Sequence, residues 1–256
     1  MSVHVIDDFT PEHVLFPRHF GRGFDLSGKT AAGYAGVADP FPEELKIPES
    51  EWQARIEEKV ASKTQISDLC DQAGLPCLNQ EQTNYCWVNG PTYCTEVIRT
   101  IQGQAPVPLS PASVGGPITG FQNVGGWAKP ALEYIAQNGI VPQSQWPANA
   151  ISSRYHTDEN VQLARGYRVM EWWDLNGPDV FENLVSCLLR GFPAAVGYNW
   201  WSHVVSAIEP VWRDGAVALR IRNSWDMTWG DRGYALIQGQ KMVPDDAVAP
   251  RVVVAA

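Results

Sequence analysis

The sequence has no long apolar run and no excess of basic residues, and both absences narrow its function. Without a run of about 20 apolar residues, no transmembrane helix is predicted. The net charge of −9 argues against a nucleic-acid partner, because contacts to phosphates need a basic face. The first residues turn acidic early and lack the pattern of a secretory signal. We therefore expect no membrane or nucleic-acid partner, and a cytoplasmic location or an export route that the sequence hides.

Cysteine and histidine are scarce, with five of each. Five is an odd number, so at least one cysteine is unpaired within the chain. Without an export signal we expect reduced thiols. Cys70, Cys77, Cys94 and Cys187 are interpreted as structural or free. No Cys/His cluster has the spacing of metal ligands, so neither a metal nor another cofactor is expected.

The residues that are present indicate an α+β protein with two lobes. Apolar residues make up 45% of the chain and charged residues 18%, which is typical of a globular protein. The patterns predict helices over residues 50–63, 84–102, 127–138 and 178–190, and β-prone runs over 193–201, 203–212, 216–225 and 233–238. We divide the chain into an N-terminal arm (1–65) and a main domain (66–256), with a helical lobe over 66–150 and a β-rich lobe over 151–256.

Residues 1–48 are rich in Gly and Pro and predict an extended arm with a turn or two. In the helix that follows, Ser50 is a candidate N-cap. Trp52, Ile56 and Val60 recur every four residues and predict one apolar stripe. Near the other end of the chain, the acidic pair Asp245–Asp246 is interpreted as solvated surface.

The segment Gly23–Thr30, "GFDLSGKT", fits the phosphate-loop pattern G-x-x-x-x-G-K-[ST]. A working phosphate loop follows a buried strand and opens a helix. Here Pro17 interrupts any preceding strand, and two glycines and two prolines follow. Nucleotide binding therefore stays a minor alternative.

Cys86 has the setting of a thiolate nucleophile. It lies at the start of a predicted helix, where the dipole stabilises negative charge and lowers a thiol pKa. Thr83 and Asn84 are candidate caps. Pro91 cannot donate to the carbonyl of Trp87, so the helix is kinked there or starts late, and a late start would misplace Cys86.

His203 is the histidine that lies in an apolar, strand-like run, and Asn223 is a candidate partner for it. Each lies ten residues from Arg213, so a hairpin folded about Arg213 would place them opposite each other. A turn centred on Asp214-Gly215 would instead pair Asn223 with Ser206. An Asn oxygen beside an imidazole would fix its orientation and tautomer.

At this point the sequence resembles the papain-like cysteine peptidases (C1-type) across roughly residues 66–240. Gln80 lies six residues before Cys86, which Trp87 follows. The segments "PLSPAS", "VGGWAKPALEYIAQNGIVPQSQWP" and "NSWDMTWGDRGYALI" resemble family segments in the same order. The resemblance implies a papain-like fold, with a helical left lobe and an antiparallel β-barrel-like right lobe.

The resemblance also implies a role for each matching residue. Cys86 would be the nucleophile and His203 its base and later its acid. Asn223 would orient His203, and Trp225 would shield that pair from water. Gln80 and the backbone N–H of Cys86 would form the oxyanion hole.

Substrate contacts follow from the same resemblance. Gly125 and Gly126 would hydrogen-bond an extended peptide. Trp127, Ser202 and Val204 would border the pocket for the side chain two residues before the scissile bond. Val204 replaces a usually smaller residue, which predicts a shallow pocket.

Several positions depart from the family pattern. The separation from Cys86 to His203 is 117 residues, shorter than the range of about 130–150 for papain relatives. Thr83 and Asn123 stand where many relatives carry a disulfide. Glu81 and Asn84 replace glycines near the nucleophile, where their side chains could crowd a substrate.

The sequence therefore predicts a cysteine peptidase that hydrolyses peptide or protein substrates through an acyl-enzyme. The main alternative is a papain-like scaffold with little or no turnover that acts as a binding or assembly protein. We also expect residues 1–65 to lie over the cleft and block it.

Overall fold

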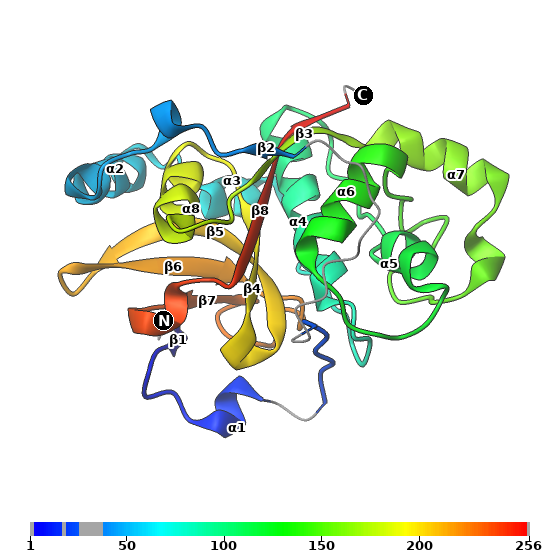
Figure 1. Cartoon of the computed structure of the whole chain (residues 1–256), viewed down its shortest axis with the longest axis horizontal. Helices are drawn as coiled ribbons and strands as arrows, with labels where there is room; N and C mark the ends of the chain where they lie inside the picture. The colour runs from blue at the N-terminus through cyan, green and yellow to red at the C-terminus, as the bar shows by residue number, and fades with distance from the viewer. Residues whose placement is uncertain (1–2, 17–18, 26–37, 255–256) are drawn as a thin grey trace.

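The computed structural model describes residues 3–16, 19–25 and 38–254. Figure 1 shows two lobes side by side, one built mainly of helices and one built around a sheet. This confirms the predicted α+β, two-lobed architecture.

The helices divide between the lobes and the arm. The α-helices are α1 (Glu12–Leu15), α2 (Glu49–Ser62), α3 (Ile66–Ala73), α4 (Cys86–Ile101), α5 (Ala112–Thr119), α6 (Ala128–Asn138), α7 (Asp158–Ala164) and α8 (Val180–Leu189). Short 3₁₀ turns are η1 (Glu43–Leu45), η2 (Ser153–Tyr155), η3 (Arg165–Tyr167), η4 (Asn199–Trp201) and η5 (Gly239–Met242).

The described residues form one eight-stranded sheet in the order β1-β7-β6-β5-β4-β8-β3-β2. Its strands are β1 (Val5–Ile6), β2 (Asp39–Pro40), β3 (Val169–Asp174), β4 (Ala194–Tyr198), β5 (His203–Arg213), β6 (Ala216–Arg222), β7 (Tyr234–Ile237) and β8 (Asp246–Val253). Pairing is antiparallel except at the two ends, where β1–β7 and β2–β3 are parallel.

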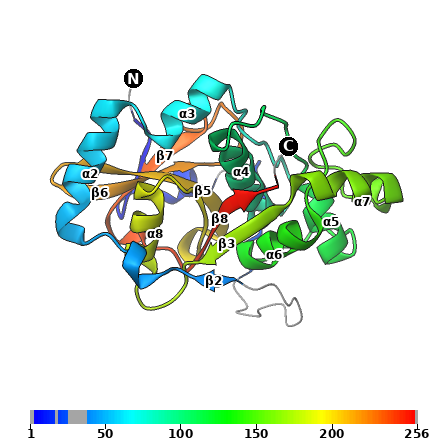
Figure 2. The same ribbon diagram turned by 90° about the horizontal axis from the view of Figure 1, so that it is seen from above.

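Strand β4 is buried on both faces, and its alternation separates the two main cores. Ala194 and Val196 point into the core beneath α2 and α8, whereas Ala195 points into the core beneath α4 and α6. Successive side chains of a strand point to opposite faces, so one strand serves both cores. Figure 2 shows these helix pairs on opposite sides of the central strands.

The N-terminal arm is part of the sheet and of the core. Its strands β1 and β2 supply the two edge strands, at opposite ends of the sheet. Ile6 and Leu15, and Trp52 and Ile56 of α2, are buried in the core that the sheet shares with α8. The arm is thus more than the extended segment with a turn or two that the sequence predicted. The division at residue 65 stays a prediction.

Helix α2 differs from its prediction at both ends. It begins at Glu49 with Pro48 as the N-cap residue, and no side chain caps it, so the prediction for Ser50 was wrong. The fixed φ of Pro48 sets the extended conformation that precedes the helix. Trp52 and Ile56 form the buried stripe, but Val60 is 52% exposed because it lies beyond the core.

Three helices and two main strands had no sequence prediction: α3, α5, α7, β3 and β8. Asp246 lies in β8 and is 3% exposed, so its interpretation as solvated surface was wrong. The strand carries it under α6, where the Ala128 backbone hydrogen-bonds its carboxyl. Among the described residues, no helix combines the length and apolar character that a bilayer crossing requires.

Glu96 is a fully buried acid in the middle of α4. Its Oε1 accepts a hydrogen bond of 2.7 Å from the backbone N–H of Leu109, and its Oε2 has no partner among the described residues. Burial raises the pKa of Glu96 from 4.5 to about 8. The folded protein therefore holds this proton at neutral pH, whereas the unfolded chain releases it.

We expect this proton to make the wild-type protein less stable as pH rises from about 4.5 to 8. At 1.36 kcal/mol per pKa unit, the loss is roughly 4 kcal/mol. Glu96→Gln keeps the acceptor for Leu109 and removes the titration. Its free energy of unfolding, measured by urea titration, should exceed the wild-type value at pH 7.5 and match it near pH 4.5.

Glu57→Gln, at an exposed position of α2, is the matched control and should track the wild type. Equal pH profiles for Glu96→Gln and the wild type would contradict this account of Glu96.

Candidate active site

Helix α4 begins at Cys86, so the late start that Pro91 raised does not occur. Tyr85 is the N-cap residue and no side chain caps the helix. The caps expected from Thr83 and Asn84 were wrong, because Thr83 Oγ1 donates back to Gln80 and Asn84 Nδ2 donates to the Asn123 carbonyl. The first turn closes through bonds from Val88 and Asn89 N–H to the Tyr85 carbonyl. Cys86 thus lies at the positive end of the helix dipole.

Gly90 lets α4 approach the sheet closely. A Cβ at this position would lie 3.0 Å from a methyl of Val204 and 3.3 Å from Ala195. The missing side chain brings the first turn of α4 against the start of β5. As a result, backbone hydrogen bonding from Val204 reaches the Cys86 thiol.

The β5–β6 hairpin turns at Asp214-Gly215, and both residues have positive φ (51° and 81°), as a type I′ turn requires. Arg213 pairs with Ala216, so the prediction of a hairpin folded about Arg213 was wrong. Further along, a bulge between Ala207 and Glu209 shifts the register, and Ser206 pairs with Arg222. His203 and Asn223 are therefore not direct cross-strand partners.

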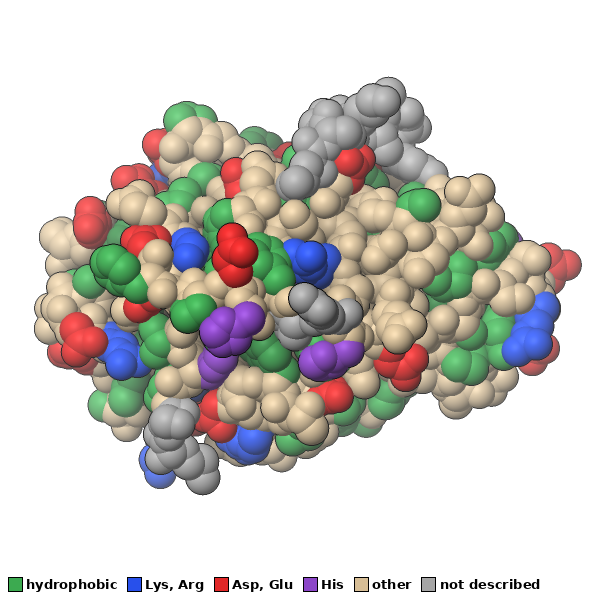
Figure 3. Space-filling view, turned by 90° about the horizontal axis from the view of Figure 1, so that it is seen from below, with side chains coloured by type: hydrophobic (Ala, Val, Ile, Leu, Met, Phe, Trp, Pro, Cys, Tyr) green, Lys and Arg blue, Asp and Glu red, His purple; other side chains and the backbone are tan. Residues whose placement is uncertain are grey.

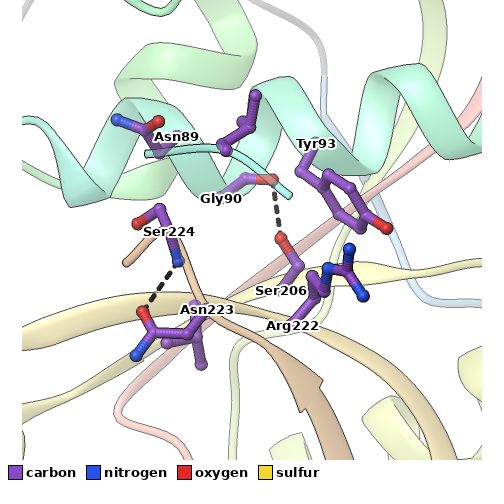
Figure 4. Close-up of a pocket in the computed structure, with 9 residues that line it drawn as sticks. Asn89, Gly90, Tyr93, Ser206, Arg222, Asn223 and Ser224 are labelled. Atoms are coloured by element: carbon purple, nitrogen blue, oxygen red, sulfur yellow. Dashed lines mark hydrogen bonds between the residues drawn. The ribbon is translucent and has the colours of Figure 1, made fainter. Parts of the chain in front are cut away.

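Their side chains nevertheless meet. His203 Nε2 lies 2.8 Å from Asn223 Oδ1, and the same oxygen accepts a bond of 2.8 Å from the Ser224 backbone N–H. Figure 4 shows the second bond, beside a small cavity of about 10 Å³ between α4 and β6. Because Oδ1 is an acceptor, Nε2 carries the proton. Nδ1 is left as a free base with no hydrogen-bond partner among the described residues.

Trp225 covers this pair from solvent. Its ring stacks on His203 with centroids 4.5 Å apart, and the side chain is fully buried. Phe20 of the arm also stacks on the ring of Trp225, with centroids 5.2 Å apart. Its role in shielding a catalytic pair stays a prediction.

The arm passes directly over Cys86 and Gln80. Gln80 Nε2 donates to the carbonyl of Gly21 at 2.9 Å, and the N–H of Gly23 donates to Cys86 Sγ at 3.1 Å. Both glycines lie flat on the main chain beneath them. A Cβ at Gly21 would come within 2.0 Å of the Thr83 oxygen, and one at Gly23 within 1.8 Å of the Asn84 oxygen.

Beyond Cys86 the arm pairs with Gly126 as an extended peptide would. The N–H of Gly126 donates to Gly23, and the N–H of Asp25 donates to Gly126, which forms a parallel bridge. The N–H of Phe24 donates to the carbonyl of Ser202 at 3.3 Å. Gly125 lies next to the same segment, since a Cβ there would be 2.4 Å from the Gly23 oxygen. Gly125 and Gly126 are the positions at which the sequence predicted backbone contacts to substrate, and that role stays a prediction.

The ring of Phe24 fills a pocket beside this bridge. It packs edge-on against Trp127, with centroids 4.5 Å apart. Val204, Gly197 and Asp246 are successive cross-strand partners on β5, β4 and β8. Direct partners share a face of the sheet, and Gly197 on that face would place a Cβ 2.7 Å from the Phe24 ring. The pocket therefore accepts a phenyl ring despite Val204, because Gly197 leaves room for it.

Asn123 holds the loop before α4 with hydrogen bonds. Its Oδ1 accepts from the Asn84 N–H at 2.6 Å, and its carbonyl accepts from the Asn84 side chain at 3.2 Å. All five cysteines are free, so no disulfide links this loop. The arm glycines lie against the main chain of Thr83 and Asn84, and the Asn84 side chain is held by Asn123.

Burial leaves the thiol and the imidazole neutral. Burial raises the Cys86 pKa to about 11, against the opposing effect of backbone hydrogen bonds from Val204 and Gly23. Burial lowers the His203 pKa to about 3, and the nearby charge of Arg22 lowers it further. Burial of the sulfur therefore outweighs the helix dipole and the backbone hydrogen bonds, which favour a thiolate.

The phosphate-loop segment lies mostly outside the described residues, which end at Asp25 and resume at residue 38. Its described part, Gly23–Asp25, follows the cleft between the lobes. Within the described residues, no group of three or more His, Cys, Asp or Glu side chains is placed to hold a metal ion. The sequence analysis missed the role of Gly21 and Gly23. Two glycines one residue apart allow the arm to pack directly against the main chain of another segment.

The two lobes, the cysteine at a helix start and the buried His–Asn pair together define a papain-like fold with a thiol site. Curated relatives that match the sequence include two cathepsins of one organism. Cathepsin L 1 of Paramecium tetraurelia is 27% identical over 247 residues, which cover 90% of this chain and 75% of the relative. Cathepsin L 2 of the same organism is 27% identical over 177 residues, which cover 63% of this chain and 54% of the relative. No model of a protein family matches the sequence.

Solved structures agree on the fold. Digestive procathepsin L 3 of Tenebrio molitor superposes with a TM-score of 0.60 at 20% identity, over 69% of this chain and 66% of that chain. Xylellain, a cysteine protease of Xylella fastidiosa, superposes with a TM-score of 0.57 at 17% identity, over 70% and 83%. The chain is thus similar in sequence to cathepsin L peptidases, and it shares the fold of papain-like, C1-type cysteine peptidases.

The arm contacts predict that Cys86 reacts slowly with iodoacetamide. At pH 8 a thiol with a pKa of about 11 is roughly 100-fold less ionised than an ordinary cysteine. The double variant Gly21→Ala/Gly23→Ala cannot lie flat on residues 83–84, so the arm should leave the cleft and labelling should accelerate. Peptide mass mapping would follow carbamidomethylation of Cys86 itself.

Gly166→Ala is the control, because a Cβ there meets no atom within 4 Å. Equal labelling rates in the wild type and the double variant would show that the arm does not protect the thiol.

Proposed function

We propose that this protein hydrolyses peptide bonds through Cys86, His203 and Asn223. The observation that carries the proposal is the 2.8 Å contact between His203 Nε2 and Asn223 Oδ1, with Nδ1 left without a partner. An imidazole held in this tautomer is a base aimed away from Asn223. The neighbouring residue Val204 contacts the Cys86 thiol, which supports a short path from that base to the sulfur.

In the proposed reaction, His203 Nδ1 takes the proton of the Cys86 thiol, and the thiolate attacks the carbonyl carbon of the peptide bond. Gln80 Nε2 and the Cys86 N–H donate to the oxygen that gains negative charge. The His203 imidazolium then protonates the departing amine, and an acyl-enzyme remains. Water, deprotonated by His203, attacks that thioester, and the acid product and the thiol are released.

The arm supports a latent state of this site. The Gly21 carbonyl accepts the hydrogen bond from Gln80 that an oxyanion would need, and the Gly23 N–H binds the sulfur. A substrate must displace both contacts. Removal of residues 1–65 would also strip Ile6, Trp52 and Ile56 from the core, so substitutions at the two glycines open the cleft with less damage.

The test uses Gly21→Ala/Gly23→Ala and a fluorogenic peptide. We expect turnover to rise above the wild type and to vanish in Cys86→Ala or His203→Ala. Gln80→Ala should lower kcat by about 10²–10³ because one oxyanion donor is lost. Gln162→Ala, at an exposed position of α7, is the matched control.

The same experiment separates the enzyme from the binding scaffold. The scaffold alternative draws support from the buried, neutral Cys86 thiol under the arm. An opened variant whose Cys86 is labelled quickly, but which cleaves no peptide in a diverse library, would favour the scaffold.

The Phe24 pocket supports a preference for large side chains two residues before the scissile bond. Its walls are Trp127 and Val204, and Asp246 lies on the same face of the sheet. Asp246 Oδ1 accepts from Asn176 and the Ala128 backbone also bonds the carboxyl, while Oδ2 has no further partner among the described residues. Burial raises the Asp246 pKa to about 6, so its carboxyl is charged above that pH. A side chain with an apolar body and a basic end would satisfy this free oxygen.

We expect the opened variant to cleave substrates with Arg at this position more efficiently as pH rises past about 6, relative to substrates with Phe. Asp246→Asn should lower kcat/KM for the Arg substrate by about tenfold, which is 1.4 kcal/mol of lost charge pairing, and leave the Phe substrate unaffected. Asp245→Asn is the exposed neighbour control. An unchanged Arg-to-Phe ratio in Asp246→Asn would remove Asp246 from substrate selection.

A further inference from the structure

A second cavity lies between the arm and the β-rich lobe, apart from the cleft that holds Cys86. Its walls come from η1 and α2 on the arm side and from the end of α8, β3 and β8 on the other side. Its volume is about 630 Å³, within the range of about 300–1,000 Å³ that is usual for small-molecule sites. None of its lining residues belongs to the candidate active site.

One part of the wall is apolar. Leu45 and Ile47 of the arm face Trp173, Leu189 and Phe192 of the lobe across this space. Trp173 and Phe192 contact each other edge-on, with centroids 5.1 Å apart, and form a rigid aromatic corner. Trp173 is 3% exposed and has the Arg251 guanidinium 4.9 Å from its ring centre, so the half-buried Phe192 is the accessible part of that corner. Such a corner suits an aryl group or a short acyl chain.

The polar part of the wall is mainly cationic. Arg55 and Arg251 have carboxylate partners already, in Glu51 for the first and in Asp39 and Glu171 for the second. Glu58 is the acidic residue among those that line the cavity.

Two further cations have no carboxylate within ion-pair distance among the described residues, and these are Lys59 and Arg190. Arg190 Nε donates to the Leu45 carbonyl at 2.8 Å, which leaves its terminal nitrogens for another acceptor. Burial lowers the pKa of Lys59, and the more distant charges of Glu209 and Glu58 oppose this effect. Lys59 is half-buried and Arg190 is exposed, and two cations without a carboxylate partner that line one cavity favour an anion there.

We propose that this cavity binds a small organic anion with an apolar body, such as an aryl or short-chain carboxylate. Its charged group would lie at Lys59 and Arg190, and its body against Phe192, Leu45 and Ile47. An inorganic anion would leave the aromatic corner empty. Because the cavity has one wall from the arm and one from the lobe, a bound anion would also hold the two together and raise thermal stability.

The probe is 8-anilinonaphthalene-1-sulfonate, an aromatic sulfonate, titrated into the full-length protein and followed by its fluorescence. We expect saturable binding at one site that 4-phenylbutyrate displaces and inorganic phosphate does not. The double variant Lys59→Met/Arg190→Gln keeps the apolar stems and removes both charges. It should bind the probe at least tenfold more weakly, and 4-phenylbutyrate should raise the Tm of the wild type alone.

The control Arg154→Gln/Arg165→Gln removes two exposed charges far from the cavity lining and should bind like the wild type. Unchanged binding by Lys59→Met/Arg190→Gln would overturn the proposal, as would displacement of the probe by inorganic phosphate alone. A Tm rise with 4-phenylbutyrate that survives in the double variant would also overturn it. The Tm of each variant without ligand verifies folding and keeps these outcomes interpretable.

Discussion

The contact between the first turns of α4 and the start of β5 determines where the reactive groups lie. It depends on Gly90, because any side chain there would push against Val204 and Ala195. With the two elements this close, the helix start that carries Cys86 meets the strand start that carries His203. The same strand continues through a tight turn into β6, whose end carries Asn223 to the far side of the imidazole. A single helix–strand contact thus assembles groups separated by more than a hundred residues.

The arm also packs closely, against the main chain just before α4 and beside Cys86. Its two glycines can lie on the main chain of residues 83–84 only because they have no Cβ. Its ends are tied into the sheet, with β1 beside β7 and β2 beside β3. A segment held at both ends by backbone ladders has no free end to dissociate. On the proposal of a latent site, opening would therefore be a local displacement of the residues near 20–25, with the edge strands left in place.

Much of the fold could be predicted because its signals are local. The Asp-Gly pair predicts the hairpin turn, and Gly139 ends α6 where the pattern indicated. Of the predicted site residues, His203 and Asn223 lie in contact, whereas the catalytic roles of Gln80, Cys86, His203 and Asn223 stay predictions. What could not be predicted is non-local. A bulge near Ile208 changes the hairpin register, main-chain contacts replace the expected caps, and the burial of Asp246 depends on β8 crossing under α6. The path of the arm through the cleft depends on tertiary contacts with no periodic signature.

Access of water, more than residue type, determines the ionisation of the Cys86 thiol and the His203 imidazole. In the closed structure each group is fully buried, and burial favours the neutral form of both. The helix dipole and the backbone N–H groups around Cys86 favour a thiolate, but they do not outweigh the loss of hydration. If the arm moves, water returns to the sulfur while the dipole and these N–H groups stay in place. The balance would then shift toward an ion pair of Cys86 and His203 with no change in either side chain. An inert scaffold and a working peptidase would thus differ in the position of two glycines of the arm.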